Sequence, residues 1–242
     1  MAKILVLAKS GFGKTTSYCG REKLGIKGLD PKETYVIQCI GRGVPNPNFK
    51  LIGSPIKIEN VGKPTQRLVD PNILTSGNRV QVDNLTGLDR FAAVAEIINI
   101  LKKAPYKNII IDDFNYLAQD FYMANAMKGG WETPKQIGYG MGLVFDAFKG
   151  MPEDKNGDSI SYKFKTTGKM VDDYITPEGK FDIILFGKVG YDPENKKPVK
   201  NFVKEFDGEY PAKDSLGALD NLADEIPNDL SIVVEELRKN YG

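Results

Sequence analysis

An α/β fold with a mostly parallel sheet is predicted by two apolar runs and the helix expected between them. Ile4–Leu7 leads into a glycine-containing turn, and Ile109–Ile111 leads into a pair of aspartates. Neither run alternates with polar residues, which is typical of strands covered on both faces, as in a parallel sheet. Asp89–Lys102 has apolar residues at helical spacing and predicts a helix leading into the second of these strands.

The turn after the first strand reads Ala8-Lys9-Ser10-Gly11-Phe12-Gly13-Lys14-Thr15 and has the spacing of a phosphate-binding P-loop, with Ala8 where glycine is most common. Glycine lets such a backbone bend and turn its N–H groups inward. A helix starting near Lys14 would favour phosphate through its dipole. Lys14 would reach the β- and γ-phosphates of ATP, and the Thr15 hydroxyl would hold Mg²⁺. The predicted nucleotide contacts are Ser10, Gly11, Phe12, Gly13, Lys14, Thr15 and Thr16. The alternative is a chance glycine-rich turn, which the length of the pattern disfavours.

The following segment should contain one helix, one strand and an irregular insertion. We expect a helix over 15–25 and a strand over Glu33–Ile40. Residues 41–80 are rich in Gly, Pro and Asn, which favours loops with short β-like pieces. A short strand is expected over Val80–Asn84.

A second candidate site element is the aspartate pair Asp112 and Asp113, at the end of the isoleucine run. Open α/β sheets bind ligands at this end of their strands. Asp112 would hold Mg²⁺ through water, and Asp113 would orient or deprotonate an attacking water. The alternative is a pair of solvated loop aspartates, and the upstream loop pattern favours the functional interpretation.

The C-terminal half should be rich in β-hairpins and end in a helix. Phe181–Phe186 is apolar enough for a core strand, and Asn201–Phe206 could pair back as a hairpin. Ile226–Asp229 would cap the final helix. The helices expected here and just before are Asn115–Lys128, Gln136–Phe148 and Leu230–Tyr241.

Composition excludes several kinds of chemistry. The 242 residues include no histidine, which removes Ser-His-Asp and Cys-His catalysis and the usual zinc sites. We interpret Cys19 and Cys39 as packing residues of a protein in a reducing cytoplasm. No apolar run reaches the length of about 18 residues that a membrane span needs, and no signal peptide is expected.

Seven short motifs stand out along the chain. They are Lys9–Ser17, Gly28–Thr34, Gly41–Pro45, Asp112–Leu117, Lys165–Met170, Glu178–Phe181 and Ile226–Leu230. Together they resemble the Sak4 proteins of bacteriophages. The resemblance covers most of the chain, and its more specific pieces are Thr-Thr-Gly-Lys, Glu-Gly-Lys-Phe and Ile-Pro-Asn-Asp-Leu.

Sak4 proteins are short RecA-like ATPases that bind single-stranded DNA and support annealing or recombination, often beside a phage single-strand-binding protein. The resemblance implies one RecA-like domain over 1–242, with helices on both faces of its sheet. The hairpin-rich region predicted from the residues would span 159–242 of this domain. It also implies a homo-oligomeric ring or filament in the host cytoplasm, with ATP at a subunit edge. A basic residue of the neighbouring subunit commonly completes such a site. Lys165 and Lys169 are the candidates, unless they only form a solvated hairpin face.

One feature departs from a RecA-type sheet. Such a sheet has a strand, tipped by a polar sensor residue, after the helix that ends near Phe148. Here Phe148–Asp158 reads as loop throughout. The strand is therefore missing, unless Ile160–Phe164 replaces it. Its loss favours an alternative function, a nucleotide-dependent assembly or sensor protein that does not hydrolyse ATP.

Single-stranded DNA binding calls for a basic groove with aromatic platforms. Lysines and aromatic residues interleave in Tyr162–Lys165 and Lys196–Lys204. Lys163, Lys165 and Arg42 are the predicted contacts. The net charge of +1 provides no global attraction for DNA, so binding would need a local cluster of basic residues or a ring of subunits. The alternative is that these residues form an ordinary charged surface.

A small-molecule kinase is a further alternative function, but the arginines that would grip its phosphate acceptor are few and unclustered, which disfavours it.

Overall fold

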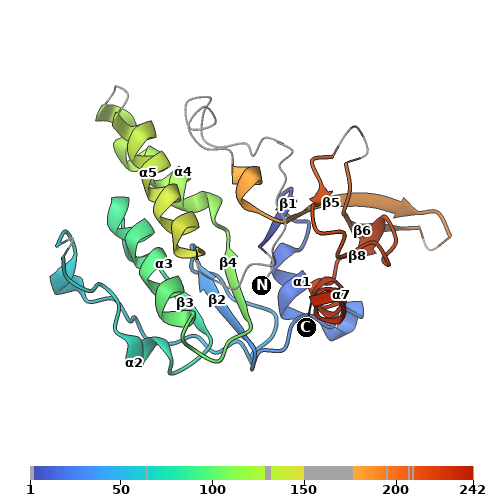
Figure 1. The fold of residues 1–242 in the computed structure, drawn as a ribbon, viewed down its shortest axis with the longest axis horizontal. Coiled ribbons are helices and arrows are strands. Elements are labelled where there is room, and N and C mark those ends of the chain that lie inside the picture. Colours follow the sequence, from blue (N-terminus) through green and yellow to red (C-terminus); the bar gives the residue numbers. More distant parts are fainter. Residues whose placement is uncertain are drawn as a thin grey trace. The chain divides into compact units, whose positions relative to one another are not determined.

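A computed structural model describes residues 3–63, 65–128, 132–149, 177–194, 196–206, 208 and 210–241. These residues belong to two compact units. Residues 3–29 and 177–241 make up unit 1, and residues 30–149 make up unit 2. Each unit has its own sheet (Figure 1). The single domain over 1–242 stays a prediction.

The described residues of unit 1 form a mixed, five-stranded sheet in which one pair of strands is parallel. The strands run in the order β1-β5-β6-β8, with β7 also paired to β5. β1 lies parallel to β5, in a register that sets Ala8 opposite Gly187, and the other pairs are antiparallel. Helix α1 contacts α7. The elements are β1 (Ile4–Ala8), α1 (Lys14–Cys19), η1 (Glu22–Leu24), η4 (Pro177–Lys180), β5 (Ile183–Asp192), β6 (Lys197–Val203), β7 (Lys213–Asp214), β8 (Glu225–Pro227) and α7 (Leu230–Tyr241).

Unit 2 contains an all-parallel, three-stranded sheet in the order β3-β2-β4. The central strand β2 lies within the strand predicted over Glu33–Ile40 and is buried along its whole length. Helix α3 packs against α5, and α4 contacts both (Figure 1). The elements are β2 (Thr34–Gln38), η2 (Ile58–Asn60), α2 (Pro71–Leu74), β3 (Arg79–Gln81), α3 (Gly87–Leu101), β4 (Asn108–Asp112), α4 (Asn115–Asn125), η3 (Ala126–Lys128) and α5 (Glu132–Ala147).

The α/β class is confirmed, but the described strands form two sheets rather than the single, mostly parallel sheet predicted. β1 and β4, the strands that precede the two candidate site elements, belong to different sheets. Residues 150–158, most of the segment that reads as loop where a RecA-type sheet has a strand, lie outside the described residues. Both cysteines are buried and free, as their interpretation as packing residues predicted.

The helix predicted over 15–25 is wrong in length, because α1 ends at Cys19. Gly20 follows with a φ of +77°, and a Cβ there would lie 2.2 Å from the carbonyl oxygen of Lys27. The chain therefore folds back on itself where a helix would continue. Leu230–Tyr241, by contrast, is a helix with the predicted bounds.

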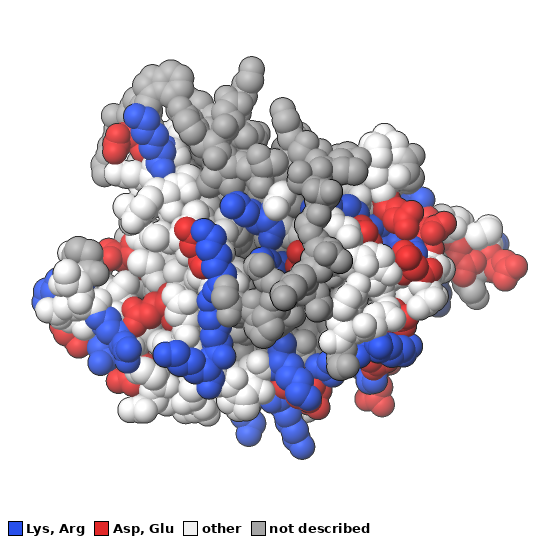
Figure 2. Space-filling view, viewed as in Figure 1, with Lys and Arg blue, Asp and Glu red and all other residues white. Residues whose placement is uncertain are grey.

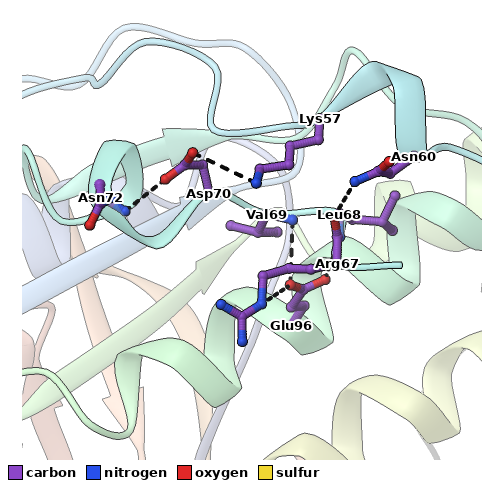
Figure 3. A network of polar contacts seen from close by, with 8 residues as sticks. All are labelled: Lys57, Asn60, Arg67, Leu68, Val69, Asp70, Asn72 and Glu96. Carbon is purple, nitrogen blue, oxygen red and sulfur yellow. Dashed lines mark hydrogen bonds and ion pairs between the residues drawn. The ribbon is translucent and has the colours of Figure 1, made fainter. Parts of the chain in front are cut away.

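The irregular segment 41–80 is held in place by polar contacts with helix α3 (Figure 3). The Glu96 carboxylate accepts hydrogen bonds from the backbone N–H of Leu68 at 2.9 Å and of Val69 at 3.4 Å. Arg67 forms an ion pair with the same carboxylate at 3.5 Å. Further along, Asp70 caps α2 by accepting from the N–H of Asn72. The segment contains η2 and α2, so it is more ordered than its composition suggested.

Replacing Glu96 should loosen this segment. We expect Glu96→Ala to lower the free energy of unfolding by about 1–3 kcal/mol, because it leaves two backbone donors without their acceptor. Urea unfolding followed by circular dichroism would measure it. The matched control is Glu59→Ala, which removes an exposed carboxylate of the same segment. Equal stabilities of the two variants would contradict the anchoring role.

Candidate functional site

The predicted nucleotide loop lies in unit 1 between β1, which ends at Ala8, and α1, which begins at Lys14. Gly11 and Gly13 have φ angles of +78° and +102°, in the left-handed region that favours glycine. The local order of strand, glycine turn and helix is therefore the predicted one. Ser10 and Gly11 are exposed, and Thr15 and Thr16 lie half-buried in the first turn of α1.

The Phe12 side chain anchors this loop to the sheet. It is buried, and its ring centroid lies 5.5 Å from that of Phe202 on β6. A Cβ at Gly187 on β5 would come within 2.8 Å of the Phe12 ring, so the ring rests directly on the strand backbone. Phe12 can therefore serve a ligand only through its backbone.

Side chains from several elements bind the carbonyl oxygens of the loop. Lys14 Nζ donates to Ala8 O at 3.1 Å, and Lys200 Nζ on β6 donates to Gly11 O at 2.7 Å. Asn228 Nδ2 lies 3.4 Å from Phe12 O and 3.5 Å from Gly13 O. Among the described residues, the backbone N–H groups of Gly11, Gly13 and Lys14 have no protein acceptor. Their donors are thus available to an anion.

The tetrapeptide Ile226–Asp229, which precedes α7, supports the loop. The sequence predicted only that it caps the helix. Asp229 accepts from the N–H of Ser231 at 2.9 Å, which is the predicted cap. It also accepts from the N–H of Lys27 at 2.7 Å and of Gly28 at 3.1 Å. Asn228 next to it is 6% exposed, and its Oδ1 has no hydrogen-bond partner among the described residues. The one sequence signal for this contact was the Ile-Pro-Asn-Asp-Leu resemblance.

In unit 2, polar residues gather at the carboxyl ends of the parallel strands. Gln38 on β2 is in register with Gln81 on β3 and with Asp112 on β4. Asp112 is buried, and its carbonyl oxygen accepts from the N–H of Cys39 at 3.1 Å. Burial raises the pKa of the Cys39 thiol, so this cysteine stays a neutral packing residue.

Asp113, the candidate base, pairs with Arg42, which sequence reasoning assigned to DNA. The carboxylate lies 3.4 Å from Arg42 Nη1, and Asp113 has a φ of +62° that few residues other than glycine, asparagine and aspartate adopt. Arg42 also lies over the ring of Tyr116, with its Cζ 5.7 Å from the centroid. Arg79 donates to the carbonyl oxygen of Arg42 at 3.2 Å and so fixes its backbone. The DNA contact of Arg42 stays a prediction.

The remaining predicted residues, Lys163, Lys165 and Lys169, lie outside the described part of the chain. Within that part, no three acidic or cysteine residues cluster as a metal site would require. No described helix is both long enough and apolar enough to cross a bilayer. On the face drawn in Figure 2, basic and acidic side chains are interspersed rather than gathered into one broad basic surface.

In comparisons with known proteins, no protein-family model and no curated protein matches the chain.

Proposed function

We propose that this chain is a RecA-like P-loop ATPase that binds single-stranded DNA and supports annealing or recombination, as do the Sak4 proteins that its motifs resemble. The observation that carries the proposal is the loop from Ala8 to Thr15. In one turn between a strand and a helix it combines two glycines with positive φ angles, the Lys14 ammonium, and backbone N–H groups that have no acceptor among the described residues. This combination suits the phosphates of a nucleotide.

The chemistry of these residues fits ATP and Mg²⁺. Lys14 pairs with no carboxylate among the described residues, so its charge is available to phosphate oxygens. The Thr15 hydroxyl and the Asp112 carboxylate are the hard oxygen donors that Mg²⁺ prefers. The metal, when bound, would neutralise charge on the transferred phosphoryl group. Asp113 is the candidate to orient the attacking water, and it would have to exchange its ion pair with Arg42 to do so.

DNA binding and assembly rest mainly on the resemblance. Lys165 and Lys169 are the candidates to complete the nucleotide site of a neighbouring subunit in a ring or filament. Lys163 and Lys165 are the candidate DNA contacts. The described residues add one supporting feature, because Tyr191 on the β5–β6 hairpin is 65% exposed and Lys197, which is in register with Asp192 on the same hairpin, is exposed as well. Stacking aromatics and lysines are what single strands bind. A phage single-strand-binding protein is a further candidate partner.

A second candidate function is a nucleotide-gated assembly protein without turnover. The sequence after Phe148 supports it, because Phe148–Asp158 reads as loop where a RecA-type sheet has its sensor strand. The described arginines disfavour the alternative of a small-molecule kinase. Arg90 is buried and paired with Asp120, and Arg79 is bonded to Gln38, so neither is free to hold a phosphate acceptor.

The decisive test is ATP hydrolysis by the full chain, with and without single-stranded DNA, at low and moderate salt. We expect multiple turnovers, stimulation by DNA, and DNA affinity that falls as salt rises. ATP binding without turnover in either condition would replace the ATPase with the assembly protein. Failure to bind ATP would overturn the proposal.

A further inference from the structure

A second lysine lies at the candidate nucleotide loop, on a strand far away in the sequence. Lys200 is in β6, opposite Val189 of β5, within the antiparallel hairpin of unit 1. Its Nζ donates to the carbonyl oxygen of Gly11 at 2.7 Å. Gly11 has no side chain, so the ammonium comes to rest on the exposed backbone at the middle of the loop.

The charge of Lys200 is uncompensated, unlike that of its neighbours. No carboxylate lies within ion-pair distance of Lys200 among the described residues. Lys188, on the same hairpin, pairs with Glu225 at 2.7 Å, and Lys27 pairs with Glu235 at 2.5 Å. An ammonium group has three donors, and Gly11 O takes one of those of Lys200. Two donors and a full positive charge therefore remain for a ligand.

Lys200 shares these properties with Lys14. Both ammonium groups bond to carbonyl oxygens of the same loop, Ala8 O for Lys14 and Gly11 O for Lys200. The loop from Ala8 to Thr15 contains no acidic residue that would offset either charge. A flexible four-carbon stem lets a lysine move its charge from a carbonyl oxygen to a nearby, more negative acceptor. A polyphosphate chain bound to this loop is such an acceptor.

We propose that Lys200 is a second polyphosphate-binding lysine, supplied by the same chain from the β5–β6 hairpin. The inference rests on the proposed function, since it assumes that the loop binds a nucleotide. It gives β6 a part in nucleotide binding beyond carrying Phe202. It also makes nucleotide binding depend on the hairpin, because strand β6 holds the Lys200 ammonium at the loop.

Calorimetric titration of the full chain with MgADP and with the non-hydrolysable MgAMP-PNP tests this role. We expect Lys200→Ala to weaken both affinities by about tenfold, the loss of one charge-assisted hydrogen bond. Lys200→Gln keeps an N–H donor for the Gly11 carbonyl but no charge, and it should lose as much as Lys200→Ala. Lys200→Arg should stay within about threefold of the wild type. The matched control is Lys188→Ala, which removes the ion-paired lysine of the same hairpin and should leave both affinities unchanged.

The variants separate phosphate binding from loop support. If Lys200 only holds the loop, Lys200→Gln will restore wild-type affinity, and the proposal is overturned. Wild-type affinity of Lys200→Ala would overturn it as well. If the wild type binds nucleotide, Lys14→Ala loses affinity, and Lys200→Ala is unaffected, only the role of Lys200 fails. If the wild type itself binds neither nucleotide, the proposed function fails with it.

Discussion

Lys14→Ala is expected to lower both ATP affinity and the rate of hydrolysis by about a hundredfold or more. The Lys14 ammonium contacts Ala8 O at 3.1 Å and has no carboxylate partner among the described residues. Its charge is therefore not needed to balance a buried acid, and its loss should cost the fold little. In a phosphate site the same ammonium neutralises the β- and γ-phosphates, so its loss should lower turnover by about a hundredfold or more.

Equilibrium binding of MgATP and the rate of phosphate release would measure the effect, with thermal unfolding to verify the fold. The matched control is Lys9→Ala, because Lys9 is an exposed lysine of the same loop whose side chain has no described contact. We expect this control to keep wild-type affinity within about threefold. Equal losses in both variants would indicate that the loop attracts anions only through its net charge, and the P-loop interpretation would be wrong.

The loop could be predicted because its determinants are local. An apolar run forms β1, and two glycines adopt the positive φ angles that the turn requires. The same holds for α7, which has its apolar face and its cap within one short stretch. Strand β4 could also be predicted from a local pattern, because it is an isoleucine run that ends in Asp112.

What sequence reasoning missed depends on contacts between residues far apart in the chain. Asn228 and Lys200 reach the loop only through the pairing of β5, β6 and β8, whose register no local pattern specifies. Likewise, α1 ends at Cys19 because the backbone of Gly20 meets that of Lys27, a contact that the apolar pattern of 15–25 does not encode. Arg42 reaches Asp113 because Arg79, on a neighbouring strand, holds its backbone.

These long-range contacts also change how the site residues should be interpreted. Asp113 and Arg42 were assigned to different tasks, catalysis and DNA binding, yet they form one ion pair beside Tyr116. A DNA strand that drew Arg42 away would leave the Asp113 carboxylate to other partners. Under the proposed function, an Arg42→Ala variant should therefore hydrolyse ATP without DNA at the rate that the wild type reaches only with DNA.

The second large effect is expected from Asp229→Ala, on stability. Asp229 is 6% exposed. Its carboxylate accepts three hydrogen bonds from backbone N–H groups, those of Lys27, Gly28 and Ser231. Removing it leaves three donors without their acceptor and uncaps α7. We expect the free energy of unfolding to fall by roughly 3–5 kcal/mol, the range seen when a buried charged partner is deleted.

Urea unfolding would measure this loss against Asp224→Ala, which removes an exposed aspartate just before β8. Asp229→Asn keeps one acceptor oxygen and should lose about half as much. Because Asn228 is the adjacent residue and bonds to the carbonyls of Phe12 and Gly13, the loop should loosen together with α7. Nucleotide affinity of Asp229→Asn should therefore fall along with stability. A variant that lost stability but kept wild-type affinity would show that the turn before α7 supports the fold and not the loop.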